Sequence, residues 1–228
     1  MGVVQAERLT IEVGPARRVS ALLLTAPQAR ACYVLAHGAG AGMSHPFLEL
    51  VAQGLQERGI ASLRYQFPYM EQGSKRPDPP PVAHATVRAA VAEAARLLPD
   101  VPLVAGGKSF GGRMTSQAQA AEAMPSLLGI AFLGFPLHPA GRPSLDRAAH
   151  LQQVARPMLF LQGTRDALAD AMLMEQVARQ LGHRARLTFF ADADHSFHVP
   201  ARSGRSDAEV RRDLLDAFAT WLKEVIGR

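Results

Sequence analysis

Residues 102–123 read PLVAGGKSFGGRMTSQAQAAEA. An apolar run typical of a strand is followed at Ser109 by a tight turn, and then by residues that favour a helix. In this context the pentapeptide Gly-x-Ser-x-Gly, here residues 107–111, holds its serine in strained backbone geometry with the hydroxyl exposed. Gly107 and Gly111 have no Cβ to collide with the neighbouring strand and helix. The stretch therefore predicts that Ser109 is a nucleophile.

The rest of the chain supplies further strand-like and helical segments. Two early strands are followed by strands that alternate with amphipathic helices, which predicts an α/β fold with a mostly parallel central sheet of about eight strands flanked by helices. Ligands of such sheets bind beyond the carboxyl ends of the strands, so we expect function in the strand-to-helix turns. Strands are expected over 9–13, 20–25, 31–36, 60–66, 102–106, 128–134, 157–162 and 186–190, and helices after residues 45, 83, 111, 170 and 207.

Two segments, 70–82 and 137–153, are predicted to be loops. Each follows a strand and so emerges at the active edge of the sheet, where a long loop is often a rim or a lid. The sequence is equally compatible with a substrate-contacting role and with an ordinary surface excursion. Neither segment is long enough for a separate cap domain, and the composition shows no break. We therefore expect residues 1–228 to form a single domain without a cap.

Composition restricts the function classes. The formal net charge of the 228 residues is +5, but the arginines are scattered and no aromatic residues are interleaved among them, so we expect no nucleic-acid binding. The N-terminus lacks a basic segment followed by an apolar run, and no stretch approaches the roughly 20 apolar residues of a membrane span, which predicts a soluble, cytoplasmic protein without membrane contact. The single cysteine, Cys32, is expected to be a buried thiol. A monomer and a small homo-oligomer are both compatible with the composition.

Two other types of site share letters with this sequence. Gly-Lys-Ser after a strand also ends a phosphate-binding Walker loop, but that loop needs a glycine where this chain has Pro102. The Asp and His residues within 192–198 suggest a metal site of the His-x-His-x-Asp-His type. The first two histidines of that motif would stand at positions 190 and 192, where this chain has Phe190 and Asp192. We therefore expect no metal, and we expect no cofactor.

A serine is inert at neutral pH unless a base takes its proton and a third group orients that base. In α/β-hydrolases these groups follow the chain order Ser, acid, His. Asp166 follows the strand-like run MLFLQ and His195 follows RLTFF, so both are expected at the sheet edge that carries Ser109. Asp170 and His198 are the second candidates for the acid and the base. The order of the three groups predicts that Ser109, Asp166 and His195 act together.

Acyl transfer also needs donors for a developing oxyanion, typically two backbone N–H groups. Residues 37–42, HGAGAG, follow the strand-like run CYVLA, where the fold places one of them. Ala39 N–H and Phe110 N–H are the expected pair, with Gly40 second to Ala39. His37 and His45 are expected to be structural or rim residues.

The motifs HGAGAGMSHPF, RYQFPY, GGKSFGGRM, GFPLHP, QGTRD and ADHSF, spread from about 35 to 198, resemble those of the dienelactone-hydrolase-like branch of the α/β-hydrolases. Within it, the chain is most similar to small lidless proteins related to a testis-expressed protein and to a hydrolase-like subunit of a chromatin acetyltransferase complex. The resemblance implies an α/β-hydrolase fold, Ser109, Asp166 and His195 as the catalytic triad, and the 37–42 turn as the oxyanion hole. A dienelactone hydrolase proper has a cysteine nucleophile, and Cys32 lies in a strand, so we do not expect dienelactone cleavage.

These features predict a serine hydrolase of the carboxylesterase type that cleaves a small acyl substrate through an acyl-enzyme on Ser109. The alternative is a catalytically silent binding or scaffold protein of the same fold, and the presence of all three groups favours the enzyme. Thioesters, peptides and peracids are chemically adjacent substrates that the sequence does not separate. Without a cap, the site is expected to be open and suited to short acyl groups. The roles of Lys108 and Arg113, which flank Ser109, stay open.

Overall fold

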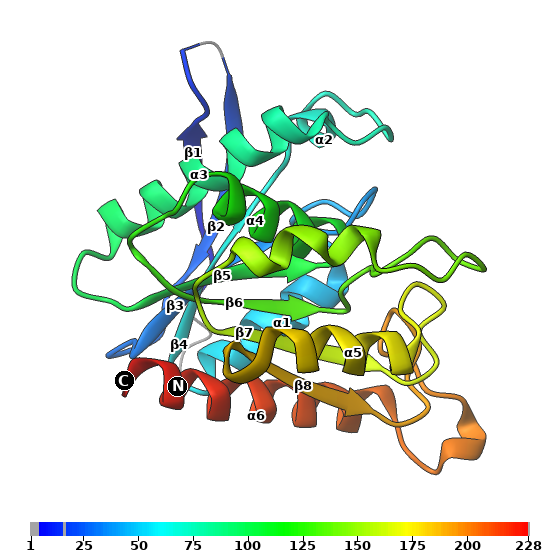
Figure 1. Cartoon of the computed structure of the whole chain (residues 1–228). Helices are drawn as coiled ribbons and strands as arrows, with labels where there is room; N and C mark the ends of the chain where they lie inside the picture. The colour runs from blue at the N-terminus through cyan, green and yellow to red at the C-terminus, as the bar shows by residue number, and fades with distance from the viewer. Residues whose placement is uncertain (1–4, 16, 228) are drawn as a thin grey trace.

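The computed structural model describes residues 5–15 and 17–227, and it places eight strands in one sheet (Figure 1). The strands are β1 (Glu7–Glu12), β2 (Arg18–Leu24), β3 (Ala31–Ala36), β4 (Ile60–Tyr65), β5 (Leu103–Lys108), β6 (Leu127–Leu133), β7 (Met158–Gly163) and β8 (Ala185–Phe190). The α-helices are α1 (Pro46–Gln56), α2 (Pro68–Glu71), α3 (Pro80–Leu97), α4 (Phe110–Ala121), α5 (Ala171–Leu181) and α6 (Asp207–Ile226). Short 3₁₀ helices are η1 (Asp146–Gln153), η2 (Gly182–Arg184) and η3 (Ala201–Ser203).

The strand order is β1-β2-β4-β3-β5-β6-β7-β8. β1 and β2 pair antiparallel, as do β2 and β4, and every other neighbouring pair is parallel. The predicted mostly parallel sheet of about eight strands is thereby confirmed. Because the parallel strands run in one direction, the turns after β3, β5, β7 and β8 all emerge at the same edge of the sheet.

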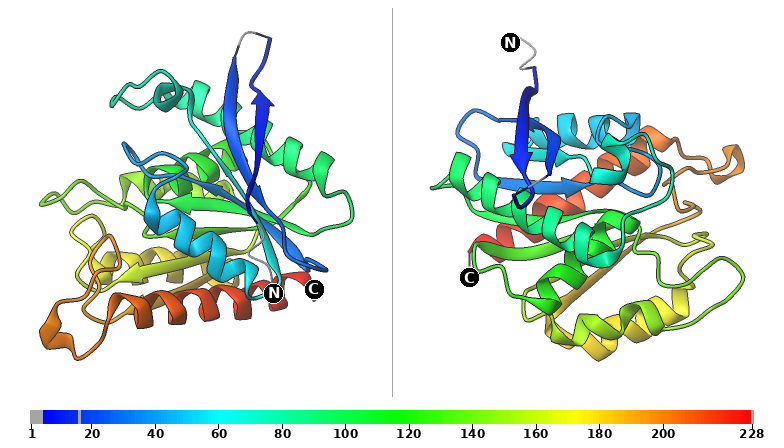
Figure 2. Two further views of the ribbon diagram at one scale, coloured as in Figure 1. Left: turned by 180° about the vertical axis from the view of Figure 1, so that it is seen from behind. Right: turned by 90° about the horizontal axis from the view of Figure 1, so that it is seen from above.

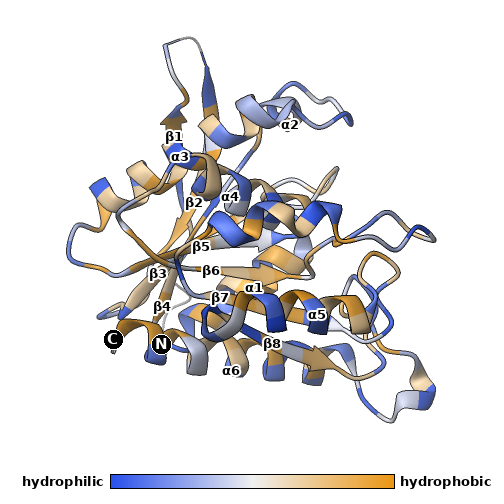
Figure 3. Cartoon of the chain, in the orientation of Figure 1, coloured by the Kyte–Doolittle hydropathy of each residue, from blue (hydrophilic) through white to orange (hydrophobic). Residues whose placement is uncertain are grey.

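Helices cover both faces of the sheet, as the views in Figure 2 show. Successive residues of a strand point to opposite faces, and in β3 Tyr33 faces the layer formed by α1 and α6 while Val34 faces the layer formed by α3 and α4. The layer of α3 and α4 continues with η1 and α5 over β6 and β7. Figure 3 shows the hydrophobic colour concentrated in the central strands, whereas the helices carry both colours. This pattern is that of amphipathic helices packed on a buried sheet.

The two predicted loops are partly helical. Segment 70–82 contains the end of α2 and the start of α3, which begins at Pro80 and not near residue 83. Proline is favourable in the first turn of a helix because that turn leaves its N–H groups unpaired, so the prolines here begin the helix that they would interrupt elsewhere. In segment 137–153, the residues from Asp146 onward form η1, which packs against α4. The second correction moves part of segment 137–153 from the edge of the sheet onto its face, because η1 packs over β6 and β7.

Within the described ranges the chain forms no separate cap over the sheet edge, as expected (Figure 1). Nor does any helix in residues 5–15 and 17–227 have the length and apolar character needed to cross a membrane.

Candidate active site

Ser109 lies in the turn between β5 and α4, with a backbone φ of 50° and ψ of −114°. A positive φ is strained for a residue with a side chain. The turn is so tight that a Cβ at Gly107 would lie 2.2 Å from the Ala36 carbonyl oxygen, and one at Gly111 would lie 2.5 Å from the His37 carbonyl oxygen. The predicted need for glycine at both positions is confirmed, since the end of β3 and its following turn leave no room for a side chain.

Three polar side chains from separate turns form one chain of hydrogen bonds. Ser109 Oγ lies 2.8 Å from His195 Nε2, and His195 Nδ1 lies 2.6 Å from Asp166 Oδ2. Because Nδ1 faces a carboxylate, it is the nitrogen that carries the proton, which leaves Nε2 to accept the proton of the serine hydroxyl. Asp166 follows β7 and His195 follows β8, so the sheet edge brings the three residues together as the sequence predicts.

Asp166 is buried and fixed by donors on both oxygens. Its Oδ1 accepts from the Leu168 amide at 2.8 Å, and its Oδ2 accepts from Gln162 Nε2 at 2.5 Å as well as from His195. Gln162, the penultimate residue of β7, is completely buried, and its Oε1 accepts from the Phe135 amide at 2.9 Å. Gln162 was not among the predicted site residues. The feature that could have indicated it is the single amide side chain at the end of the apolar strand MLFLQ, because a buried amide needs hydrogen-bond partners.

The loop that carries His195 is built around Asp194. Asp194 Oδ1 accepts from the Ser196 amide at 2.7 Å and from the His198 amide at 3.0 Å, and the Asp194 amide donates to the His198 carbonyl at 2.9 Å. The loop also lies against the end of β7, where a Cβ at Gly163 would come within 2.2 Å of the Ala193 carbonyl oxygen. These contacts fix the backbone on either side of His195.

The expected oxyanion donors differ in availability. Gly40 N–H donates to Tyr69 Oη at 3.2 Å, so it is already engaged. In the described part of the chain neither Ala39 N–H nor Phe110 N–H donates to another protein group, and Ala39 lines the cavity at Ser109. Phe110 N–H is in the first turn of α4, where amides lack partners and the positive end of the helix favours negative charge. The geometry therefore favours Ala39 over Gly40 as the partner of Phe110.

His37 is buried beneath the turn that follows β3, and His45 lies at the rim of the site. His37 Nδ1 donates to the Gly38 carbonyl at 2.8 Å, and its Nε2 accepts from the Phe67 amide at 3.0 Å. Burial lowers the pKa of His37 to about 4, so this histidine is neutral at pH 7. His45 is the N-cap of α1, accepts from the Phe47 amide at 3.2 Å, and lines the cavity. Both are structural or rim residues, as expected.

The second candidates for acid and base have other contacts. Asp170 is the N-cap of α5, and its Oδ1 accepts from the Leu173 amide at 3.0 Å. His198 is exposed, and its Nδ1 lies 2.9 Å from Asp207 Oδ2. The Asp207 carboxylate raises the pKa of His198. Neither residue contacts Ser109, so the geometry favours Asp166 and His195.

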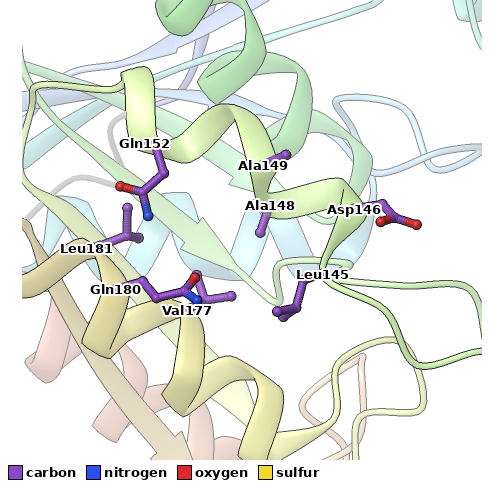
Figure 4. Close-up of a pocket in the computed structure, with 8 residues that line it drawn as sticks. All are labelled: Leu145, Asp146, Ala148, Ala149, Gln152, Val177, Gln180 and Leu181. Atoms are coloured by element: carbon purple, nitrogen blue, oxygen red, sulfur yellow. The ribbon is translucent and has the colours of Figure 1, made fainter.

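A cavity of about 370 Å³ opens at Ser109. Its lining combines the polar groups of the site with apolar side chains: Gly38, Ala39, Ala41, His45, Phe47, Leu48, Lys108, Ser109, Leu168, His195 and Ser196. A smaller cavity of about 220 Å³ lies between η1 and α5 (Figure 4). Its walls are formed by Leu, Ala, Val and Gln side chains together with Asp146, and they hold no base beside a nucleophile. Of these two cavities, the one at Ser109 is suited to covalent chemistry, because it combines a serine with a histidine.

Lys108 and Arg113, which flank Ser109, face different surroundings. Lys108 lines the cavity and donates from Nζ to the His195 carbonyl at 2.5 Å. Arg113 is not among the lining residues, and burial together with the neighbouring Arg147 charge lowers its pKa. Residues 5–15 and 17–227 contain no group of three or more His, Cys, Asp or Glu side chains arranged to hold a metal ion.

Comparison with known proteins relates this geometry to one family. The sequence model of the alpha/beta hydrolase domain family matches residues 29–223 of this chain. Among solved structures, a dienelactone hydrolase from Anabaena variabilis is 21% identical with a TM-score of 0.75, covering 94% of this chain and 96% of that one. A lidless serine hydrolase from Xanthomonas campestris is 21% identical with a TM-score of 0.73, covering 97% of both chains. An esterase domain from Rhodothermus marinus is 17% identical with a TM-score of 0.73, covering 96% of this chain and 98% of that one.

Proposed function

The chain belongs to the alpha/beta hydrolase domain family, and on that premise we propose that it is a serine hydrolase that cleaves small ester substrates through an acyl-enzyme on Ser109. The observation that carries the proposal is the unbroken chain of hydrogen bonds from Asp166 through His195 to Ser109, with distances of 2.6 Å and 2.8 Å. A protein used only for binding has no need of this arrangement beside a cavity.

The first half of the reaction forms the acyl-enzyme. Ser109 Oγ attacks the carbonyl carbon of the ester while its proton passes to His195 Nε2, and the carbonyl oxygen becomes an oxyanion. Phe110 N–H and Ala39 N–H are the proposed donors to that oxyanion. The imidazolium is stabilised by Asp166, whose carboxylate is held by Gln162 and Leu168. When the tetrahedral intermediate collapses, the bond to the alkoxide breaks and His195 returns the proton to the leaving oxygen.

The second half of the reaction hydrolyses the acyl-enzyme, with water in place of the serine as the nucleophile and with the same catalytic residues. His195 Nε2 takes a proton from a water molecule, whose oxygen attacks the acyl carbon. A second oxyanion forms at the same two amides and collapses, which breaks the bond to Ser109 Oγ. The proton returns to the serine, the carboxylic acid leaves, and the site is restored.

The cavity favours short acyl groups. Phe47, Leu48 and Leu168 supply an apolar surface inside a volume of about 370 Å³, and no cap domain extends the site in the described residues. We expect faster turnover of short-chain than of long-chain 4-nitrophenyl esters, and no turnover in Ser109→Ala. A preference for acyl chains beyond about eight carbons would contradict the assignment of a small substrate. We propose esters, and not thioesters, peptides or peracids, as the substrate class because the similar solved structures include an esterase domain.

Several wider assignments belong to the same proposal. We place the chain with the lidless hydrolases related to the testis-expressed protein, on the motifs between about 35 and 198. We also propose a single domain over residues 1–228, a cytoplasmic location, a small-molecule acyl substrate, and a monomer or small homo-oligomer that contacts neither nucleic acid nor membrane.

A further inference from the structure

Lys108 forms a cationic part of the cavity wall that the reaction above does not use. It is the last residue of β5 and directly precedes Ser109. Its Nζ donates to the backbone carbonyl oxygen of His195 at 2.5 Å and lies 5.7 Å from the centre of the Phe197 ring, within the range of a cation–π contact. The contact joins positions 87 residues apart in the sequence. It therefore ties the end of the strand that supplies the nucleophile to the loop that supplies the base.

Two glycine turns border the Lys108 side chain, and one of them, at Gly134, leaves space for its ammonium. A Cβ at Gly134, which has a φ of +73°, would lie 3.0 Å from Lys108 Nζ and 3.4 Å from His195 Cε1. A Cβ at Gly38 would lie 3.5 Å from Lys108 Cγ, in ordinary contact. The turns after β3 and β6 thus enclose the stem and the head of the lysine. A lysine that only covers the surface needs no such enclosure.

Burial of the Lys108 ammonium costs free energy, and neighbouring groups offset part of that cost. Burial lowers the pKa of Lys108 to about 8, and the carboxylates of Asp166 and Asp194 oppose that change. At neutral pH the group is therefore mostly charged. A partly desolvated charge needs strong partners, and a charge-assisted hydrogen bond to a carbonyl is such a partner.

We propose that Lys108 is a positioning residue whose ammonium holds the His195 backbone, so that His195 Nε2 stays within hydrogen-bonding distance of Ser109 Oγ. The inference rests on the proposed function, since it assumes that His195 is the base. It concerns the alignment of base and nucleophile, which a small displacement is enough to disturb.

The first test replaces the ammonium with an apolar end of similar length. In Lys108→Met we expect kcat for a short-chain ester to fall about 10- to 100-fold, with KM within about twofold of wild type, because alignment and not substrate binding is lost. Labelling of Ser109 by a fluorophosphonate should slow by a similar factor. The matched control is Lys223→Met on α6, an exposed lysine outside the cavity, which should keep wild-type kcat.

The second test restores the ammonium chemically. In Lys108→Cys, the thiolate of the introduced side chain displaces bromide from 2-bromoethylamine, which gives a thioether with an ammonium at nearly the reach of lysine. Cys32 should not react, because it is completely buried and burial raises the pKa of its thiol to about 12. Treatment should leave wild-type activity unchanged and should recover most of the kcat lost in Lys108→Cys. Intact mass counts the added groups.

The outcomes separate the two proposals. Wild-type kcat in Lys108→Met, or a single aminoethyl addition to Lys108→Cys without recovery of kcat, would overturn the role of Lys108. If Lys108→Met fails to fold, the comparison of Lys108→Cys before and after alkylation decides alone. A wild-type protein that the fluorophosphonate does not label contradicts the proposed function itself. A wild type and a Lys108→Met variant that are labelled equally fast contradict only the positioning role.

Discussion

Replacing Gln162 by leucine tests how the acid of the site is held. Gln162 is completely buried and makes two hydrogen bonds, accepting from the Phe135 amide at 2.9 Å and donating to Asp166 at 2.5 Å. Gln162→Leu is close in volume but removes both. The Phe135 N–H is then left buried without a partner, which costs about 1–3 kcal/mol, and the Asp166 carboxylate loses one of its donors, which costs about 1.5–3 kcal/mol.

The added apolar burial of leucine offsets part of this loss, so we expect the free energy of unfolding to fall by about 2–4 kcal/mol. For a chain of this size that corresponds to a decrease in Tm of about 5–15 °C. Asp166 keeps its bonds to the Leu168 amide and to His195. We therefore expect kcat/KM to fall only about 10- to 100-fold, since about 1.4 kcal/mol of lost alignment gives a factor of ten.

The measurement combines thermal unfolding with turnover of a short-chain 4-nitrophenyl ester, well below the Tm of the variant. Tyr33→Phe is the matched control, because Tyr33 is completely buried and donates from Oη to the Ala131 carbonyl at 2.8 Å, on the α1 and α6 face of the sheet. It should lose about 1 kcal/mol of stability with unchanged kcat/KM. If Gln162→Leu lost stability but kept kcat/KM within about twofold of wild type, the proposed support of Asp166 would be refuted.

Further substitutions test other parts of the site. Gly107→Ala should lower both Tm and the fraction of Ser109 that a fluorophosphonate labels, because the added Cβ would lie 2.2 Å from the Ala36 carbonyl oxygen. A Tm and a labelled fraction equal to those of the wild type would contradict the tight turn at Ser109. Asp166→Asn should keep the fold and reduce kcat by about 10³- to 10⁴-fold, measured by ester hydrolysis, whereas a loss below about tenfold would remove Asp166 as the acid. His198→Ala should keep kcat. Because the Asp207 carboxylate raises the pKa of His198 in the folded state, this histidine stabilises the fold below its ordinary pKa of about 6.5 and less as pH rises through the raised value, so the Tm difference from wild type should be larger near pH 5.5 than near pH 8.5.

Much of this arrangement follows from local sequence. The order of apolar runs gives the parallel sheet, and the position of Ser109, Asp166 and His195 directly after three such runs places them at one edge. Strand β5 nevertheless runs on to Lys108, beyond the predicted end at 106. Glycines are rare in strands, so the pattern stops early. Here they are required, since a Cβ at Gly106 would lie 1.8 Å from the Ala131 carbonyl oxygen of β6.

What the sequence did not predict depends on contacts between distant residues. Gln162 reaches Phe135 across 27 positions, and Lys108 reaches His195 across 87. Tyr69 accepts a hydrogen bond from the Gly40 amide, and it lies on the short helix α2, which the sequence pattern did not predict and which begins before the predicted loop 70–82. Periodicity and motif spacing describe neighbours along the chain, and they do not define which side chain from another strand end will satisfy a buried polar group.

Covalent labelling with a fluorophosphonate shows whether Ser109 is an activated nucleophile. The serine oxygen displaces fluoride from phosphorus, so intact mass reports the stoichiometry and peptide mapping reports the position. We expect a single adduct on Ser109 of the wild type, a greatly slowed reaction in His195→Ala, and no adduct in Ser109→Ala. An unlabelled wild type, or an undiminished adduct in Ser109→Ala, would contradict the assignment of Ser109 as the nucleophile.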